Sequence, residues 1–439
     1  MKFLTGLATF LVVLLSIVFF VVLPWQGLVV IALALAAWMG LTRRGQQAAS
    51  VTGVGVSTLG QRLGSSAVIV IGIAGVVGVL VALFAMAQGY ADTLRSTGSA
   101  DTAIVLRGAS ASEVSSVLSH DSVLVIGQAP GVAKDAEGKP IVSAELVVAA
   151  NLPLKNAKSS DDFGSVQLRG IGEEAWKLRK NAKILAGRKP EPGKYELVAG
   201  KGAQANFSGL EPGKEIKLGS QLWTVSGVFA TGDSFESEIW ADAQIVGAAY
   251  RRGSSVTTVF ARLTGADAFE PFKAALTSDP RLQVDVDTTL GYFSKQSEGM
   301  SKIITIIGSV VGAIMAIGAV FGALNTMFAA VATRAREIAT LRAIGFRGLP
   351  VVVAIMLETM LLALIGGALG GLIAWLIFNG YTASTLAGGS TGALTFQFHV
   401  APSVLWTGLK WALAIGFIGG LYPALRAARL PVTTALRES

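Results

Sequence analysis

Long apolar runs alternate with one polar stretch along this chain of 439 residues. Six runs approach or reach the roughly 20 residues that a helix needs to cross a bilayer. They lie at residues 4–23, 27–41, 67–87, 303–332, 351–378 and 404–421. A stretch of about 210 residues with soluble composition separates the third run from the fourth. This pattern predicts a polytopic membrane protein with one large domain outside the bilayer.

Arginines occupy only one set of the connections between the runs. Arg43, Arg44 and Arg62 follow the second run, four arginines separate the fourth from the fifth, and three follow the sixth. The connections at residues 24–26 and 379–403 contain neither Lys nor Arg. Because cytoplasmic loops carry the excess of basic residues, we expect six crossings, cytoplasmic termini and an extracytoplasmic large domain.

The first run can also be read as a signal peptide, because Lys2 precedes it. Its length exceeds that of a typical signal-peptide core, and a second apolar run follows. We therefore predict a transmembrane hairpin over residues 1–42. A cytoplasmic amphipathic segment is predicted at 43–66, with its helix at 56–65.

The large domain alternates between predicted strands and helices. Strand, helix and strand are expected at residues 102–107, 110–119 and 122–126, and again at 257–263, 267–276 and 282–286. Shorter strands are expected between them at 196–199, 215–218 and 222–229. The predicted fold class is an α-helical polytopic membrane protein with a large extracytoplasmic α+β domain, made of a split α/β subdomain (101–139 and 250–288) and a β-rich insertion (about 140–249).

The remaining segments follow from the apolar runs. Helical continuation is expected from the third run toward Arg95 and from residue 290 into the fourth run. The expected order is transmembrane helix 67–90, periplasmic domain 91–300, transmembrane helix 301–332, connecting helix 333–349, transmembrane helix 350–379, periplasmic loop 380–402, transmembrane helix 403–422 and cytoplasmic tail 423–439.

Charge differs between the large domain and the rest of the chain. Residues 90–301 hold 25 of the 28 acidic and 23 of the 36 basic residues, a net charge of −2 (23 − 25), while the remainder carries +10 (13 − 3). No soluble domain therefore has the basic patch that a nucleic-acid partner requires. We expect the arginines to face anionic membrane lipids.

No catalytic or metal-binding pattern stands out in the sequence. There is no cysteine, and the two histidines, His120 and His399, lie in separate stretches. Gly-Lys pairs begin at Gly138, Gly193 and Gly213, but none is followed by the Ser or Thr that a P-loop requires. These pairs are predicted turns. We expect no enzyme activity, no metal and no directly bound cofactor.

The segment between the fourth and fifth runs predicts a short amphipathic helix. Ile338, Leu341 and Ile344 are expected along one face, and Gly345 is expected to end the helix. Such a helix either docks on a partner or forms a turn at the membrane surface, and the residues alone favour neither.

Small and charged residues mark the membrane helices. Glycines expected to allow close helix packing are Gly75, Gly78, Gly308, Gly312, Gly318 and Gly322. Glu358 and Lys410 lie inside apolar runs, where charge is costly. We expect Glu358 to pair with an arginine near the cytoplasmic side, the alternative being a proton or substrate path. Lys410 receives no role.

Three motifs resemble the MacB/FtsX family of ABC permeases. They are Arg336-Glu-Ile-Ala-Thr-Leu-Arg-Ala-Ile-Gly345, Glu358 with the later Gly366-Gly-Ala-Leu-Gly-Gly371, and Gly419-Gly-Leu-Tyr-Pro-Ala-Leu-Arg-Ala-Ala-Arg-Leu430. The resemblance covers residues 56–439, and it leaves the amino-terminal hairpin as an addition to the four helices of the family core. It implies a coupling helix that docks on an ATPase, with the residues Arg334, Arg336, Glu337, Ile338, Leu341, Arg342, Ile344 and Gly345.

The resemblance also implies function and partners. We expect a permease subunit in the inner membrane, a separate ABC ATP-binding subunit that supplies ATP and Mg²⁺, and a second permease protomer. A periplasmic adaptor and an outer-membrane channel can complete such a system. The expected task is export or efflux of a hydrophobic compound, peptide or lipoprotein. The alternative is an FtsX-like regulator that activates a periplasmic cell-wall hydrolase without transport.

Overall fold

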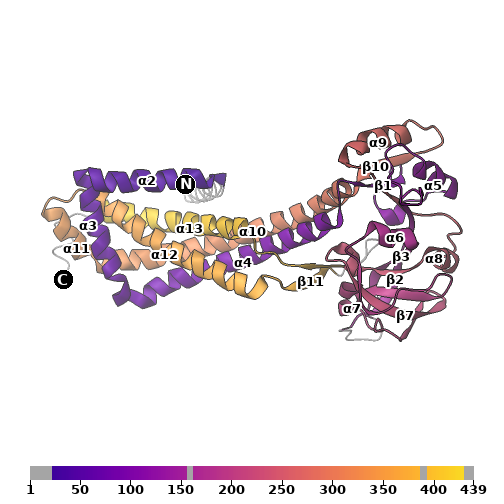
Figure 1. The fold of residues 1–439 in the computed structure, drawn as a ribbon. Helices are drawn as coiled ribbons and strands as arrows, with labels where there is room; N and C mark the ends of the chain where they lie inside the picture. The colour runs from indigo at the N-terminus through magenta and orange to yellow at the C-terminus, as the bar shows by residue number, and fades with distance from the viewer. Residues whose placement is uncertain (1–21, 156–161, 386–392, 430–439) are drawn as a thin grey trace, which may run out of the picture. The chain divides into compact units, whose positions relative to one another are not determined.

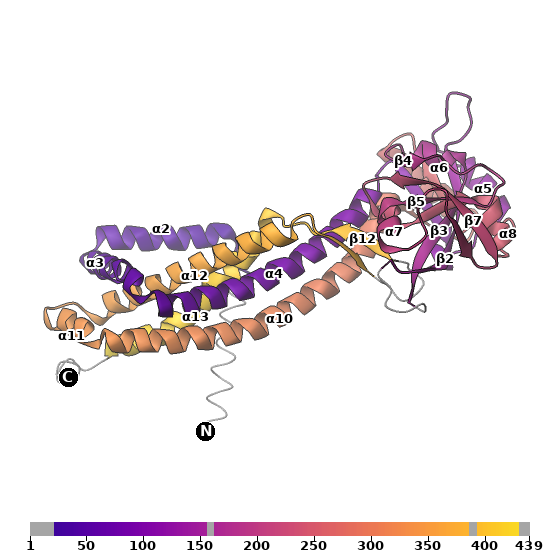
Figure 2. The same cartoon turned by 90° about the horizontal axis from the view of Figure 1, so that it is seen from below.

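The computed structural model describes residues 22–155, 162–385 and 393–429 (Figures 1 and 2). The chain forms two compact units, each built from separate stretches of sequence. The helical unit comprises Met1–Gln88, Ile303–Gly380 and His399–Ser439. The α/β unit comprises Gly89–Lys302 and Tyr381–Phe398.

Long apolar helices form the helical unit. Its helices are α2 (Trp25–Leu41), α3 (Arg43–Ser57), α11 (Ala335–Ala343), α12 (Gly348–Phe378), α13 (Pro402–Arg429) and the larger parts of α4 (Leu63–Thr97) and α10 (Thr289–Thr333). Within the described residues, α4, α10, α12 and α13 are long and apolar enough to cross a membrane, and the bent pair α2–α3 would add a fifth span. The first predicted run lies almost wholly outside the described residues. The expected helical continuations are confirmed, because α4 reaches Thr97 and α10 begins at Thr289.

A sharp bend of 102° separates α2 from α3. The Thr42 side chain accepts a hydrogen bond from the Gly45 amide (2.9 Å) and so caps α3. A Cβ atom on Gly45 would overlap the Trp38 carbonyl, so the bend requires glycine there. The amphipathic helix predicted at 56–65 is wrong. That stretch contains the end of α3, a 3-10 turn (Leu59–Arg62) and the start of α4.

Glycines bring the backbones of the membrane helices together. Helix α12 packs against α13 and α3. A Cβ on Gly370 of α12 would press on the backbone of Ala74 in α4, and one on Gly416 of α13 would overlap Ala363 of α12. Close backbone approach of this kind is how small residues stabilise helix contacts in lipid.

Four strands and two helices form the first half of the α/β unit. They are β1 (Thr102–Arg107), α5 (His120–Gly127), β2 (Val142–Pro153), β9 (Thr258–Arg262), α9 (Phe269–Thr277) and β10 (Val284–Thr288). The strands lie in the order β10-β1-β9-β2, and each neighbouring pair is antiparallel. Two β-α-β units thus interleave as in a ferredoxin-like fold.

The first β-α-β unit differs from its prediction in the positions of its helix and second strand. The helix predicted at 110–119 is wrong, because only a 3-10 turn (Glu113–Ser115) forms there. The strand predicted at 122–126 is helix α5 instead. The Ser119 hydroxyl accepts the Ser122 amide (3.3 Å) and caps that helix, which overrides the strand-like apolar run. The second unit, β9-α9-β10, follows its prediction.

The insertion extends the same sheet to ten strands. Its elements are β3 (Phe163–Ile171), α6 (Glu173–Leu178), β4 (Lys183–Gly187), β5 (Glu196–Gly200), α7 (Lys201–Asn206), β6 (Glu215–Leu218), β7 (Gln221–Ala230), β8 (Ile239–Asp242) and α8 (Ala243–Ala249). Strand β2 links the halves, pairing with β9 through its first residues and with β3 through its last. The strands predicted at 196–199, 215–218 and 222–229 are confirmed as β5, β6 and β7.

The stretch predicted as a loop at 380–402 contains a β-hairpin of the α/β unit. Its strands are β11 (Thr382–Thr385) and β12 (Leu394–Gln397). The Ala393 amide donates to the Ser165 carbonyl (2.8 Å), and the Thr395 amide donates to the Ser237 hydroxyl (2.8 Å). This late segment of the chain therefore completes the core of a unit that begins at Gly89.

Five charged side chains form a buried ion cluster between the two halves of the α/β unit: Glu113, Glu145, Arg169, Arg179 and Glu238. Arg169 donates to Glu238 (2.6 Å), Glu113 (2.7 Å) and Glu145 (2.9 Å), and Arg179 binds Glu145 (2.6 Å). With three carboxylates and two guanidinium groups, the fully ionised cluster has one excess negative charge.

Burial raises the pKa of Glu113, and Arg169 only partly opposes that rise. Burial also acts on Glu145, but Arg179 and Arg169 outweigh it and lower the pKa of Glu145. Of these two carboxyl groups, Glu113 is therefore the one that is harder to ionise within the buried ion cluster.

Replacing Glu113 by glutamine should change the pH dependence of stability. A folded pKa above the unfolded value of about 4.3 stabilises the fold at low pH, and that stabilisation is lost as pH rises through the folded pKa. Glu113→Gln removes this loss. The melting temperature of the variant should therefore rise relative to that of the native protein as the pH increases from 4 to 8. Tryptophan fluorescence of nanodisc-held protein measures it. Exposed Glu137→Gln is the control, and a pH-independent Glu113→Gln difference would contradict the assignment.

Candidate functional site

Helix α11 is a short helix between two long ones. It begins after Arg334, directly beyond the end of α10, and its last residue, Ala343, is followed by a turn at Ile344 and Gly345, whose φ is +108°. The Phe346 amide donates to the Leu341 carbonyl (3.0 Å) and the Gly345 amide to the Arg342 carbonyl (3.2 Å). These are the two hydrogen bonds of a Schellman motif, which requires a residue in the left-handed region and favours glycine there.

The predicted apolar face of α11 is divided between the inside and the outside. Ile338 is buried (6% exposed), whereas Ile344 is 69% exposed and Leu341 lies between these extremes. The cause is geometric, because each three-residue step turns the helix by about 60° away from the previous side chain. The exposed side instead consists of Arg336, Glu337, Thr340, Ala343 and Ile344.

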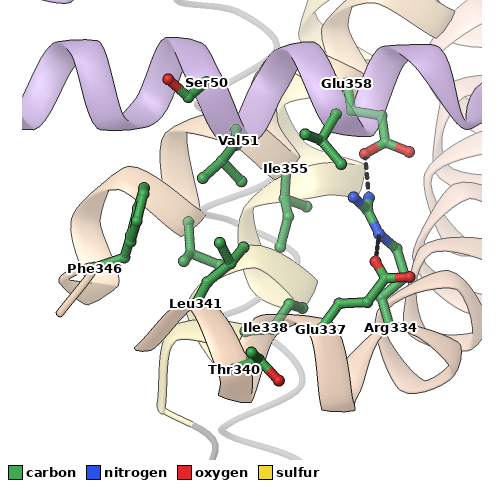
Figure 3. A pocket seen from close by; sticks show the side chains of 13 residues that line it. Ser50, Val51, Arg334, Glu337, Ile338, Thr340, Leu341, Phe346, Ile355 and Glu358 are labelled. Carbon is green, nitrogen blue, oxygen red and sulfur yellow. Dashed lines mark hydrogen bonds and ion pairs between the residues drawn. The ribbon is translucent and has the colours of Figure 1, made fainter. Parts of the chain in front are cut away.

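A cavity of about 390 Å³ lies behind α11 (Figure 3). Three helices line it: Ser50, Val51 and Val54 come from α3, Ile338 and Leu341 from α11, and Val351, Ala354 and Ile355 from α12. Phe346, from the turn after α11, lines it as well. The walls are mainly apolar, and the charged side chains gather at one end (Figure 3).

An ion pair lies at that charged end of the cavity. The Arg334 Nη1 atom is 3.0 Å from Glu358 Oε2, and its Nε atom is 3.2 Å from Glu337 Oε2. The Arg334 and Glu358 side chains are only 12% and 7% exposed. Glu358 thus has the arginine partner that the sequence led us to expect. The pair joins the start of α11 to the interior of α12.

The six predicted packing glycines fall into two groups. Gly308 and Gly312 face α4, where added Cβ atoms would meet Leu83 (3.2 Å) and overlap Leu80. Gly78 faces the backbone of α12. The other three, Gly75, Gly318 and Gly322, have no atom of the described chain within 4 Å of such a Cβ. Lys410 is half-buried in α13 and is not part of this site.

Sequence reasoning missed the contribution of α3. Its buried residues are Gly45, Ala48, Val51 and Gly55, at spacings of three and four. That spacing marks one helical face, and it was available in the sequence. Because three of the four side chains are small or absent, the sequence shows no apolar pattern along this face.

Two family models match different parts of the chain. Residues 66–279 match the model of a MacB-like periplasmic core domain, and residues 309–432 match that of an FtsX-like permease C-terminal domain. Helix α11 lies within the second match. The helices α2 and α3 lie outside both.

Curated relatives carry corresponding names. The chain is 32% identical over 133 residues to the uncharacterized ABC transporter permease YknZ of Bacillus subtilis (strain 168), covering 30% of this chain and 31% of that one. It is 31% identical over 148 residues to the macrolide export ATP-binding/permease protein MacB of Rhodopirellula baltica, covering 31% of this chain and 20% of that one. The matches thus span less than a third of either relative.

Among solved structures, the extracellular domain of the ABC-type transporter YknZ from Gram-positive bacteria has a TM-score of 0.32 at 18% identity, covering 43% of this chain and 100% of that one. The matched family models and named relatives agree with the membrane helices and the α/β unit described above. Over residues 66–279 and 309–432, the chain is therefore similar to ABC transporter permeases of the MacB/FtsX type.

Proposed function

We propose that this chain is the permease subunit of a MacB-type ABC transporter and that a separate ATP-binding subunit docks on α11. In this proposal, ATP hydrolysis in the partner moves α11, and the continuous helices α10 and α4 carry the movement toward the α/β unit. The output is export or efflux of a hydrophobic compound, a peptide or a lipoprotein. ATP and Mg²⁺ are bound by the partner.

The exposed side of α11 is the observation that carries the proposal. Ile344 is 69% exposed, while Ile338, about 120° further round the same helix, is buried in the interior. Interfaces obtain most of their binding free energy from a few anchoring residues. A helix held in place before binding also loses less conformational entropy when the partner docks. Ile344 is thus a pre-positioned anchor.

The remaining partners and the orientation are part of the same proposal. The arginines of the connections support an inner-membrane location with cytoplasmic termini and a periplasmic α/β unit. A second permease protomer, identical or different, provides a partner for the open glycine side of α10 at Gly318 and Gly322. An adaptor and an outer-membrane channel can extend the system beyond the periplasm.

Replacing Ile344 by aspartate tests the docking. A charge placed in a desolvated anchor position should cost about 2 kcal/mol or more, which is a loss of about thirtyfold in affinity. The measurement is the affinity of the ATP-binding subunit that co-purifies with the native chain. Asp at Leu341 as well would strengthen the effect, but Leu341 also lines the cavity, so the single substitution is cleaner.

The matched control is Leu185→Asp, because Leu185 is a similarly exposed (56%) apolar residue in the α/β unit. That variant should bind the ATP-binding subunit as the native chain does. If Ile344→Asp binds the ATP-binding subunit with native-like affinity, α11 is not the docking helix.

A further inference from the structure

Helix α3 packs directly against the ion pair that holds α11. Helix α3 packs against α12, and Figure 3 shows α3 passing next to Glu358 at the cavity. A Cβ atom placed on Gly55 would lie 3.1 Å from Glu358 Oε2 and 3.6 Å from Arg334 Nη1 and Nη2. The α3 backbone therefore lies directly against the ion pair at Gly55.

This cover affects the strength of the ion pair. Both side chains are nearly buried, and the apolar cavity wall adjoins them. Excluding water lowers the local dielectric constant and strengthens the attraction between the two charges. The absence of a side chain at Gly55 lets the helix exclude water without displacing either charged group.

The ion pair in turn fixes the direction of α11. Arg334 is the residue between α10 and α11, and its guanidinium binds both Glu337 in the first turn of α11 and Glu358 in α12. A displaced Glu358 would free Arg334 and leave the junction of the two helices without its buried partner. The helices α10, α11 and α12 would then no longer move together as one rigid body.

We infer that α3 is a positioning element for the coupling helix, and that Gly55 is the residue through which it acts. The inference rests on the proposed docking of an ATP-binding subunit on α11, and it gives a role to a segment outside both family-model matches. Through the bend at Gly45, α3 is joined directly to the apolar helix α2.

A pair of glycines on the same helix provides a matched test. Gly55→Leu pushes a side chain toward Glu358, whereas the Cβ of Gly53→Leu has no atom of the described chain within 4 Å. Both changes alter helix propensity equally. With the native complex in nanodiscs, Gly55→Leu should keep its affinity for the ATP-binding subunit within about threefold but lower ATP turnover roughly tenfold, within the usual range of coupling between sites. Gly53→Leu should match the native complex in both.

A double substitution separates positioning from general damage. Glu358→Ala removes the group that Gly55→Leu displaces, and it vacates part of the space that the new side chain needs. Adding Gly55→Leu to Glu358→Ala should therefore lower turnover no further than Glu358→Ala alone does. Gly55→Ala, which adds only the Cβ, should show a smaller loss than Gly55→Leu.

Several results would overturn the inference. These are equal turnover in Gly55→Leu and Gly53→Leu, additive losses in the double variant, or loss of the ATP-binding subunit from Gly55→Leu. If Gly55→Leu does not accumulate in membranes, Gly55→Ala against Gly53→Ala makes the same comparison. Failure of the native chain to bind any ATP-binding subunit would instead refute the proposed function. Normal binding by Ile344→Asp would refute docking on α11, and with it the inference that rests on that docking.

Discussion

Replacing Arg169 by methionine is expected to unfold the α/β unit. Arg169 is 1% exposed and is in ion-pair contact with Glu113, Glu145 and Glu238. Methionine fills much of the space but neutralises none of the three carboxylates. Removing one partner of a buried ion pair costs about 3–5 kcal/mol, and here the lost group serves several partners. The expected loss approaches the whole stability of a typical domain, about 5–15 kcal/mol.

Pulse proteolysis in increasing urea, on nanodisc-held protein, measures this effect. Arg281→Met is the control, because Arg281 is exposed and its partner Asp279 is two residues away; its midpoint should equal that of the native protein. Adding Glu113→Gln and Glu238→Gln to Arg169→Met should recover much of the loss, because the uncompensated charges are then gone. A native-like midpoint for Arg169→Met alone would show that the buried ion cluster is not structural.

Replacing Gly312 by isoleucine is expected to separate ATP turnover from the response of the α/β unit. A side chain at Gly312 would overlap Leu80, which is fully buried in α4 and has little room to move. Overpacking of this kind costs about 1–3 kcal/mol. That is insufficient to unfold the helical unit, but it is comparable with the few kcal/mol that separate two conformations. The proposed complex with the ATP-binding subunit should still assemble and hydrolyse ATP.

The measurement combines ATP turnover with ATP-dependent hydrogen exchange at the start of α10. Gly72→Ile is the matched control, because it adds the same side chain to α4, the other helix of this contact, at a position whose added Cβ has no atom of the described chain within 4 Å. Loss of the ATP-dependent exchange in Gly312→Ile, but not in Gly72→Ile, is the expected pattern. An unchanged response in both variants would mean that the contact between α4 and α10 carries no movement.

Elements with a strong local signal were predictable from the sequence. The strands at Thr102–Arg107 and Glu215–Leu218 have the predicted bounds, because β-branched and apolar residues stand between turn residues there. The start of α10 was predictable for the same kind of reason, since no proline interrupts the chain between Thr289 and the apolar run. Gly138, Gly193 and Gly213 have positive φ, as predicted turns should.

The main errors have local causes too. Four apolar residues in a row at 123–126 favour a strand, but the Ser119 cap makes a helix there. The face of α3 was missed because its buried positions are mostly glycine and alanine. Ile338 and Ile344 were assigned to one face, although their spacing of six residues turns the helix by about 120° between them.

The buried ion cluster could not have been predicted from one sequence. Glu113 and Glu238 are 125 positions apart (238 − 113), and each stands in a locally polar stretch that favours exposure. Charged residues are almost never fully buried unless they are paired, and the pairs form only when β3 and β8 have aligned. The partner of Glu358 was easier to predict, because the candidate arginines all lie in the short connection between the fourth and fifth apolar runs.

The β11–β12 hairpin gives the α/β unit an unusual order of synthesis. Residues 89–302 leave the ribosome first, but Ala393 and Leu394 complete their hydrophobic clusters. About ninety more residues, including α12, must be made in between, which takes roughly 5–20 s at ordinary translation rates. Until then the Ser165 carbonyl and the neighbouring apolar side chains of the nascent α/β unit lack their contacts with the hairpin. The α/β unit can therefore be completed only after α10 and α12 have been made. A chain truncated within α12 would keep an incomplete α/β unit, which proteases and chaperones can recognise.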